Sequence, residues 1–251
     1  MMLDNLSSGK WLLVLGANSD MAIAIARRFA QAGWSLQLAS RNIETLQTEA
    51  QHLQVAYGVQ AEAYEFDARD TGSHAAFYNA LAHKPDGVIV AFGLLGDQTE
   101  SQTDFAQALA VMETNYTGAV SICEVIATDL EQRQQGFIVG ISSVAGDRGR
   151  ASNYIYGSSK AAFSAYLSGL RHRLFKSGVH VMTVKPGFVA TKMTEGLDLL
   201  AKLTATPQEV AQAVFNGVSK RKSVIYVKWM WRYIMLIIIH LPGFIFNKTK
   251  L

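Results

Sequence analysis

Apolar positions along the chain follow two alternating periods. Short runs of aliphatic and β-branched residues predict seven strands, which start near residues 11, 34, 59, 86, 136, 179 and 223. Amphipathic segments between them predict helices over about 20–33, 42–53, 73–83, 101–133, 154–178 and 207–220. Strands that recur with a helix between each pair form a parallel sheet that is covered on both faces. The pattern therefore predicts an α/β fold, a doubly wound parallel sheet of about seven strands.

The composition predicts one domain over residues 1–227, followed by a hydrophobic extension over 228–251. A chain of 251 residues with 49% hydrophobic content can fill the core of such a domain. The single cysteine, Cys123, excludes an intrachain disulfide framework and a zinc knuckle, and fits a reducing compartment. The chain starts with an acidic residue near its beginning and a short apolar run before Gly16. We therefore expect no signal peptide, a cytoplasmic location and no bound metal.

Candidate ligand-binding residues follow the ends of the predicted strands. In a doubly wound sheet, ligands bind outside the carboxyl ends of the strands, where the strand order reverses. After the first strand, Gly16 can make a tight turn and Ser19 or Asp20 can cap a helix, whose N-terminus can hold an anion. After the second strand, Arg41 occupies the place where an acidic residue would select NAD. Arg41, with Ser40 beside it, instead favours the 2′-phosphate of NADP(H).

The segment YIYGSSK contains two tyrosines, and their spacing from a lysine distinguishes them. Residues four apart project from the same face of a helix, so Tyr156 can meet Lys160. Tyr154 is six positions from Lys160, on another face. A phenol with a pKa of about 10 is a poor acid at neutral pH, and a nearby ammonium lowers that pKa by favouring the phenolate. Tyr156 and Lys160 are therefore the candidate proton-donating pair.

These residues, in this order, resemble the short-chain dehydrogenase/reductase family over roughly residues 11–227. The family motif Tyr-x-x-x-Lys matches Tyr156 to Lys160, and its serine thirteen residues earlier matches Ser143. The resemblance implies a Rossmann-type fold and an oxidoreductase that uses NADP(H). It implies that Tyr156 protonates a carbonyl oxygen that Ser143 positions. It also implies that Asn115 holds a water, which continues the proton path from Lys160.

The resemblance further implies which residues bind the cofactor. They are Gly16, Asn18, Ser19, Asp20, Ser40, Arg41, Asp67, Ala91, Gly93, Tyr156, Lys160, Pro186, Gly187, Val189 and Thr191. Among them, Asp67 would contact the adenine and Thr191 the nicotinamide carboxamide. This sequence departs from the family pattern Gly-x-x-x-Gly-x-Gly, because Asp20 and Ala22 stand at the positions of its second and third glycines. Asp20 would repel two phosphates unless its carboxylate turns back to cap the helix.

A narrower resemblance concerns the substrate. The sequence VAFG at 90–93, the segment 142–160 and the hydrophobic tail are similar to the polyprenyl-phosphoryl 2-ketopentofuranose reductases. This similarity implies hydride transfer to a ketone on a lipid-linked sugar. The alternative substrate is a steroid, sphingoid or fatty-acyl ketone, and the alternative without turnover is an NADP(H)-binding sensor or scaffold. Family members pair through the two long helices, here starting near Asn115 and Tyr154, which implies a homo-oligomer.

The tail over 228–251 differs from the rest of the chain in charge and hydropathy. Seven of the 23 basic residues follow Glu209, and none of the other acidic residues does. Pro242 and Gly243 leave about 20 Å of continuous helix before them, which is too short to cross a bilayer.

We expect this tail to lie on an anionic membrane surface, with its tryptophans and aliphatic side chains in the lipid. The protein would then associate peripherally with the inner face of a membrane. A tail folded over the substrate cleft or into a subunit interface is the alternative. We expect no nucleic-acid partner, because Trp, Ile, Leu and Phe dominate the tail in place of a dense basic run.

Overall fold

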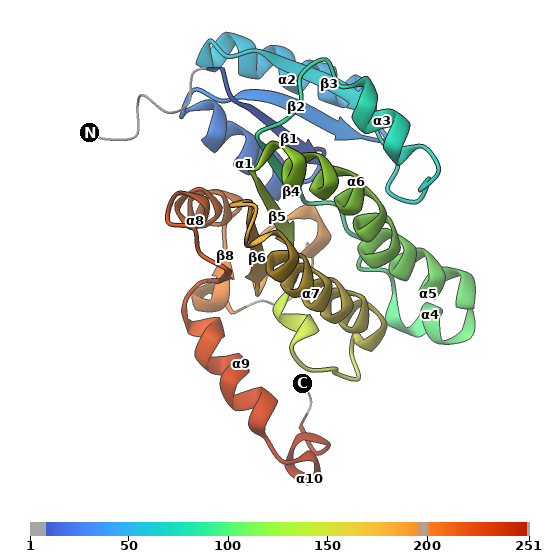
Figure 1. Cartoon of the computed structure of the whole chain (residues 1–251). Coiled ribbons are helices and arrows are strands. Elements are labelled where there is room, and N and C mark those ends of the chain that lie inside the picture. The colour runs from blue at the N-terminus through green and yellow to red at the C-terminus, as the bar shows by residue number, and fades with distance from the viewer. Residues whose placement is uncertain (1–8, 195, 197–199, 250–251) are drawn as a thin grey trace.

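A parallel sheet of seven strands forms the centre of the molecule in the computed structural model, which describes residues 9–194, 196 and 200–249 (Figure 1). Its strand order is β3-β2-β1-β4-β5-β6-β9, and every neighbouring pair is parallel. The strands are β1 (Trp11–Leu15), β2 (Ser35–Ser40), β3 (Ala61–Glu65), β4 (Gly87–Val90), β5 (Phe137–Ile141), β6 (His180–Pro186) and β9 (Val224–Val227). The predicted α/β fold with seven parallel strands is confirmed.

Helices cover both faces of the sheet (Figure 1). One face packs against α1 (Asp20–Ala30), α2 (Ile43–Tyr57) and α8 (Pro207–Ser219). The other face packs against α3 (His74–Ala80), α6 (Gly118–Arg133) and α7 (Tyr154–Leu174). Strand β1 is a continuous apolar run because both of its faces are buried. Leu12 and Val14 belong to the core on the side of α1, α2 and α8, whereas Leu13 and Leu15 belong to the core on the side of α3, α6 and α7.

The strand order reverses between β1 and β4, which are hydrogen-bonded neighbours although two strands separate them in the chain. The loops that follow these two strands meet at the carboxyl edge of the sheet. Gly16, directly after β1, has φ +81°, and a Cβ atom on it would lie 2.5 Å from the backbone N of Phe92. Only glycine fits this turn. The loops therefore adjoin where a doubly wound sheet binds ligands.

The segment 101–133 is helical as predicted, and the structure divides it into several helices. It contains α4 (Gln98–Thr103), α5 (Phe105–Met112), one π-helical turn (Glu113–Thr117) and then α6. Asp104 causes the first break, since its backbone is extended and its side chain accepts a hydrogen bond from the N–H of Ala106. The π turn carries Asn115, and such turns occur frequently at functional sites.

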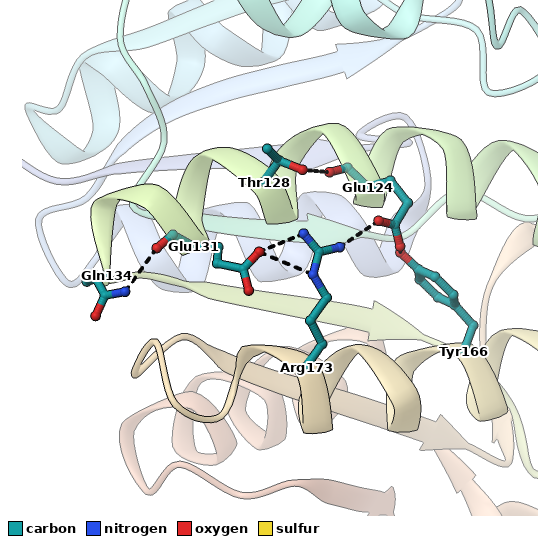
Figure 2. Close-up of polar contacts among 6 residues, drawn as sticks. All are labelled: Glu124, Thr128, Glu131, Gln134, Tyr166 and Arg173. Carbon is teal, nitrogen blue, oxygen red and sulfur yellow. Dashed lines mark hydrogen bonds and ion pairs between the residues drawn. The ribbon is translucent and has the colours of Figure 1, made fainter.

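A polar network joins α6 to α7 on the surface of the molecule (Figure 2). The guanidinium of Arg173 on α7 contacts the carboxylates of Glu124 and Glu131 on α6, each at 2.7 Å. The hydroxyl of Tyr166 donates to Glu124 at 2.8 Å. Such exposed pairs contribute little to the free energy of unfolding. Their consequence is a charged outer surface on the helix pair through which the resemblance implies oligomerisation.

The C-terminal segment forms α9 (Met230–His240) and α10 (Gly243–Phe246), which extend away from the sheet (Figure 1). One side of α9, formed by Trp231, Met235 and Ile238, packs with Val144 and Phe188 in a separate apolar cluster. The expectation that both tail tryptophans enter lipid is therefore wrong for Trp231, which is 4% exposed. Among the described residues, no helix has the length and apolar character needed to span a bilayer.

Two short strands were not predicted from the sequence. They are β7 (Phe188–Val189) and β8 (Thr204–Ala205), which pair in parallel outside the main sheet. Strands of two residues are too short to show a period. Their pairing ties the chain that follows β6 to the start of α8, whose N-terminus has a capping box between Thr206 and Glu209.

Candidate active site

A cavity of about 620 Å³ lies at the carboxyl edge of the sheet. Of the residues predicted from the sequence, it is lined by Gly16, Asn18, Ser19, Ser40, Arg41, Asp67, Ala91, Gly93, Tyr156 and Lys160. It is also lined by residues that sequence reasoning missed, namely Met21, Asn42, Phe66, Ala68, Arg69, Phe92, Leu94, Thr114, Ile141 and Ser142. Most of these adjoin predicted residues in the same loops, so including the neighbours of each strand end would have found them.

Tyr156 and Lys160 meet on the first turns of α7, as the helical spacing predicts. Both line the cavity, and the Nζ atom of Lys160 lies 5.8 Å from the centre of the Tyr156 ring. The side chain of Tyr154, in contrast, is 45% exposed at the start of the helix. Of the two tyrosines, Tyr156 is therefore the one that lies with Lys160 at the cavity.

Burial shifts the pKa values of both members of this pair. It raises the pKa of the Tyr156 phenol, and the hydrogen bond with Ser143 lowers it in part. It lowers the pKa of the Lys160 ammonium to about 8. The prediction that Lys160 leaves Tyr156 with a depressed pKa is thus wrong for this structure, because desolvation outweighs any benefit to the phenolate.

Helix α7 is bonded to the end of β5 near Lys160. The Nζ of Lys160 donates to the carbonyl of Ile141 at 3.1 Å, and the Ser142 hydroxyl donates to the carbonyl of Lys160 at 3.0 Å. The next residue, Ser143, accepts a hydrogen bond from the N–H of Ala145 at 3.1 Å. These contacts hold the predicted serine and lysine in fixed positions relative to each other.

The side chain of Asn115 bonds to neighbouring protein groups. It is 1% exposed. Its Oδ1 accepts from the N–H of Leu94 at 2.7 Å, and its Nδ2 donates to the carbonyl of Leu94 at 2.8 Å and to the hydroxyl of Ser159 at 3.0 Å. The side chain therefore positions the Gly93–Leu94 backbone beside α7, and the water-holding role implied by the resemblance stays a prediction.

Polar side chains converge beside Arg41. The Nδ2 of Asn18 donates to the Ser40 hydroxyl at 2.6 Å and to the carbonyl of Asn42 at 3.2 Å. These bonds tie the loop after β1 to the loop after β2. Arg41 is exposed and lines the cavity, whereas Arg69 on the same cavity is paired with Glu113 at 2.8 Å. Arg41 therefore has the freedom to meet an anion there.

Asp20 does not cap α1 and does not line the cavity. Ser19 caps the helix instead, accepting from the N–H of Ala22 at 3.2 Å. The Oδ2 of Asp20 accepts from the backbone N–H of Lys192 at 3.0 Å. The carboxylate is thereby directed to the segment after β7, which reduces the repulsion expected for it near phosphates.

The predicted residues from the end of β6 onward, Pro186, Gly187, Val189 and Thr191, are not among those that line the cavity. Gly187 contacts α9, because a Cβ atom on it would lie 2.0 Å from the ring of Trp231. Pro186 ends β6, Val189 is buried in the core, and the N–H of Thr191 donates to the hydroxyl of Thr194 at 3.1 Å. Among the residues that the structure describes, no group of three or more His, Cys, Asp or Glu side chains could hold a metal ion.

The fold and this constellation define an oxidoreductase of the short-chain type. The model of the short chain dehydrogenase family matches residues 10–199, and the chain belongs to that family. It is 36% identical over 240 residues to an uncharacterized oxidoreductase of Mycobacterium tuberculosis, covering 94% of this chain and 96% of that protein. It is 37% identical over 240 residues to an uncharacterized oxidoreductase of Streptomyces coelicolor, covering 94% of each.

A solved structure has the same fold. The short-chain dehydrogenase from Sphingobium yanoikuyae in complex with NADPH is 25% identical, with a TM-score of 0.79. The match covers 90% of this chain and 92% of that one.

Proposed function

We propose that the protein is a reductase that uses NADP(H) to transfer hydride reversibly to a ketone. One observation carries the proposal: Tyr156 and Lys160 lie together on the wall of the cavity that also includes Arg41. Family membership and the NADPH complex of the Sphingobium relative support it. The test is whether the purified protein oxidises NADPH only when a carbonyl compound is present. Cofactor binding without such oxidation, for every ketone tried, would favour the sensor or scaffold alternative.

The cavity fits a dinucleotide phosphate in its chemistry. Its lining contains the α1 N-terminus, where backbone N–H groups favour an anion, and the tight turn at Gly16. Arg41 and Ser40 supply donors for a 2′-phosphate, and Asp67 can accept from the adenine. These are the residues that would hold the cofactor.

The side chains of the site would handle the proton of the reaction. The bound cofactor supplies the hydride. Tyr156, with its raised pKa, stays in the acid form at neutral pH and gives its proton to the carbonyl oxygen. Ser143 donates a hydrogen bond to the same oxygen, and the positive charge of Lys160 stabilises the phenolate that the transfer leaves.

Reduction should depend on pH through Lys160. With a pKa of about 8, its side chain is positively charged below that pH and neutral above it. The phenol of Tyr156 has a raised pKa and keeps its proton through this range. We therefore expect kcat/KM for reduction to fall as the pH rises above about 8, measured between pH 6 and 10. NADPH titrations at each pH provide the control, and an unchanged kcat/KM up to pH 9.5 would contradict the assignment.

Replacing Arg41 should remove the preference for NADP(H). A charge-assisted contact is worth about 1.5 to 3 kcal/mol, so Arg41→Ala should lose roughly tenfold to hundredfold in NADPH affinity while NADH affinity changes little. Titration of both cofactors measures the ratio. Arg69→Ala is the matched control, because Arg69 lines the same cavity but is paired with Glu113. An unaltered ratio in Arg41→Ala would remove this residue from the phosphate site.

The proposed substrate is a ketone on a lipid-linked sugar, such as a polyprenyl-phosphoryl keto-pentose. Its support is the similarity of the sequence at 90–93 and 142–160 to the polyprenyl-phosphoryl 2-ketopentofuranose reductases. A steroid, sphingoid or fatty-acyl ketone is the alternative. A panel of these ketones, presented in detergent or lipid, compares their kcat/KM values directly.

We also propose a homo-oligomer that assembles through α6 and α7, as the family resemblance implies. Symmetric association is the general expectation for soluble enzymes. The ion pairs between Arg173 and two glutamates join these two helices within one chain, so the helix pair can meet a partner as one unit. Light scattering in mild detergent should give a mass above that of one chain, and a monomer at every concentration would refute the proposal.

Peripheral association with the inner face of a membrane, from the cytoplasm, completes the proposal. Its support is the exposed apolar side of α9, which includes Trp229, Tyr233 and Ile237, together with the excess of basic residues after Glu209. Truncation after Val227 would not test membrane association by itself. It also removes Trp231 from the buried cluster that contains Val144, and so changes the packing of the protein.

A further inference from the structure

A groove separates the outer side of α9 from the edge strand β9. It has a volume of about 850 Å³. Its lining includes three aromatic rings, those of Tyr226, Trp229 and Tyr233, and two cations, Lys222 and Arg232. We call it the β9–α9 groove. Four of its nine lining residues precede residue 228, so the groove is formed by the tail and the strand before it together.

The groove continues onto an exposed apolar ridge. Leu236 and Ile239 line the groove and remain exposed. Beyond them, Ile237, Phe244 and Ile245 project from α9 and α10 and are exposed as well. Contiguous apolar surface of this kind marks an interaction site. The opposite side of α9 is buried, so the helix itself has a fixed orientation on the protein.

The charge of the groove favours an anionic partner. Lys222 and Arg232 are both exposed on it. The carboxylates that bond to this part of the chain are already neutralised: Glu209 pairs with Lys228 at 2.9 Å, and buried Asp147 pairs with Lys185. The chain contains no acidic residue after Glu209.

A second copy of the chain would bring more positive charge to this surface. In a twofold-symmetric interface, the same patch lies on both subunits and residues near the axis face their own counterparts. Arg232 and Lys222 would then oppose like charges with no carboxylate between them. A bilayer with anionic headgroups supplies the missing negative charge, and its interfacial layer accepts tryptophan and tyrosine rings with aliphatic side chains.

We infer that the β9–α9 groove and its ridge are the surface that docks on anionic phospholipid headgroups. This inference rests on the membrane association proposed above, and it assigns that association to particular residues. The groove is linked to the loop that carries Ser143, because the hydroxyl of Tyr226 donates to Asp147 at 2.8 Å, four residues after Ser143. Docking would hold the substrate side near the bilayer, where a lipid-linked ketone resides.

Vesicle flotation of the full-length protein tests the inference. The probes are phosphatidylcholine vesicles with and without phosphatidylglycerol. The wild type should float with the anionic vesicles only. The double variant Lys222→Gln/Arg232→Gln should partition about thirtyfold more weakly, because each basic residue near an anionic surface contributes about fivefold. The control Lys10→Gln/Lys84→Gln removes two charges beside the inner strands β1 and β4 and should bind like the wild type.

Three results would overturn the inference. They are equal flotation of the wild type with neutral vesicles, no flotation with anionic ones, and equal losses in both double variants. Light scattering could also show that the wild type is a dimer and that Trp229→Ala is a monomer. That result would indicate self-association through the groove in place of membrane docking.

Turnover of a small soluble ketone should be the same in all variants. Its failure in the wild type would count against the proposed reductase and not against the groove.

Discussion

Tyr156→Phe should lower kcat by about 10²- to 10⁴-fold, because it deletes the proton donor and leaves the ring in place. Tyr156 is the one tyrosine among the described residues that line the cavity, so no other phenol there can replace it. NADPH affinity should change little, since Arg41 and the α1 N-terminus remain. Steady-state kinetics and NADPH titration measure the two quantities separately.

Tyr154→Phe is the matched control, since it makes the same chemical change two residues earlier. Its side chain is on the surface at the start of α7, so kcat should stay within about twofold of the wild type. Comparable losses in the two variants would mean that the phase of α7 relative to the cavity is not the one described.

Trp231→Ala should destabilise the protein by about 3–5 kcal/mol, the range for truncating a large aromatic side chain in a core. The indole packs edge-on against Phe188 with ring centres 5.2 Å apart, and its Nε1 donates to the carbonyl of Leu203 at 2.9 Å. The truncation leaves a cavity against Gly187 and frees that carbonyl. Urea denaturation gives the free energy of unfolding.

Trp229→Ala provides the comparison for this second prediction. Trp229 is 71% exposed and two residues earlier, so its removal should change the free energy of unfolding by no more than about 0.5 kcal/mol. The same variant should bind anionic vesicles less well. If both tryptophan variants lost stability equally, α9 would not be docked by one side as described.

Local spacing explains which features could be predicted from the sequence. The apolar run of β1 requires burial on both faces, which implies helices on either side. The four-residue interval from Tyr156 to Lys160 places both on one side of a helix whatever that helix contacts. Gly16 follows a strand end, where a tight turn is required. These inferences depend on neighbours within a few positions, and the structure agrees with them.

The remaining features depend on contacts between residues far apart in the chain. The sequence by itself determined the parallel α/β sheet, the tyrosine that meets the lysine and the basic, apolar character of the tail. Only the tertiary structure decided that Asp20 bonds to Lys192, 172 positions away, and that Asn115 holds Leu94. It alone decided that Trp231 is buried while Trp229 is exposed. The two tryptophans have similar local sequences. They differ in burial because folding brings Gly187 and Phe188 against the side of α9 that carries Trp231.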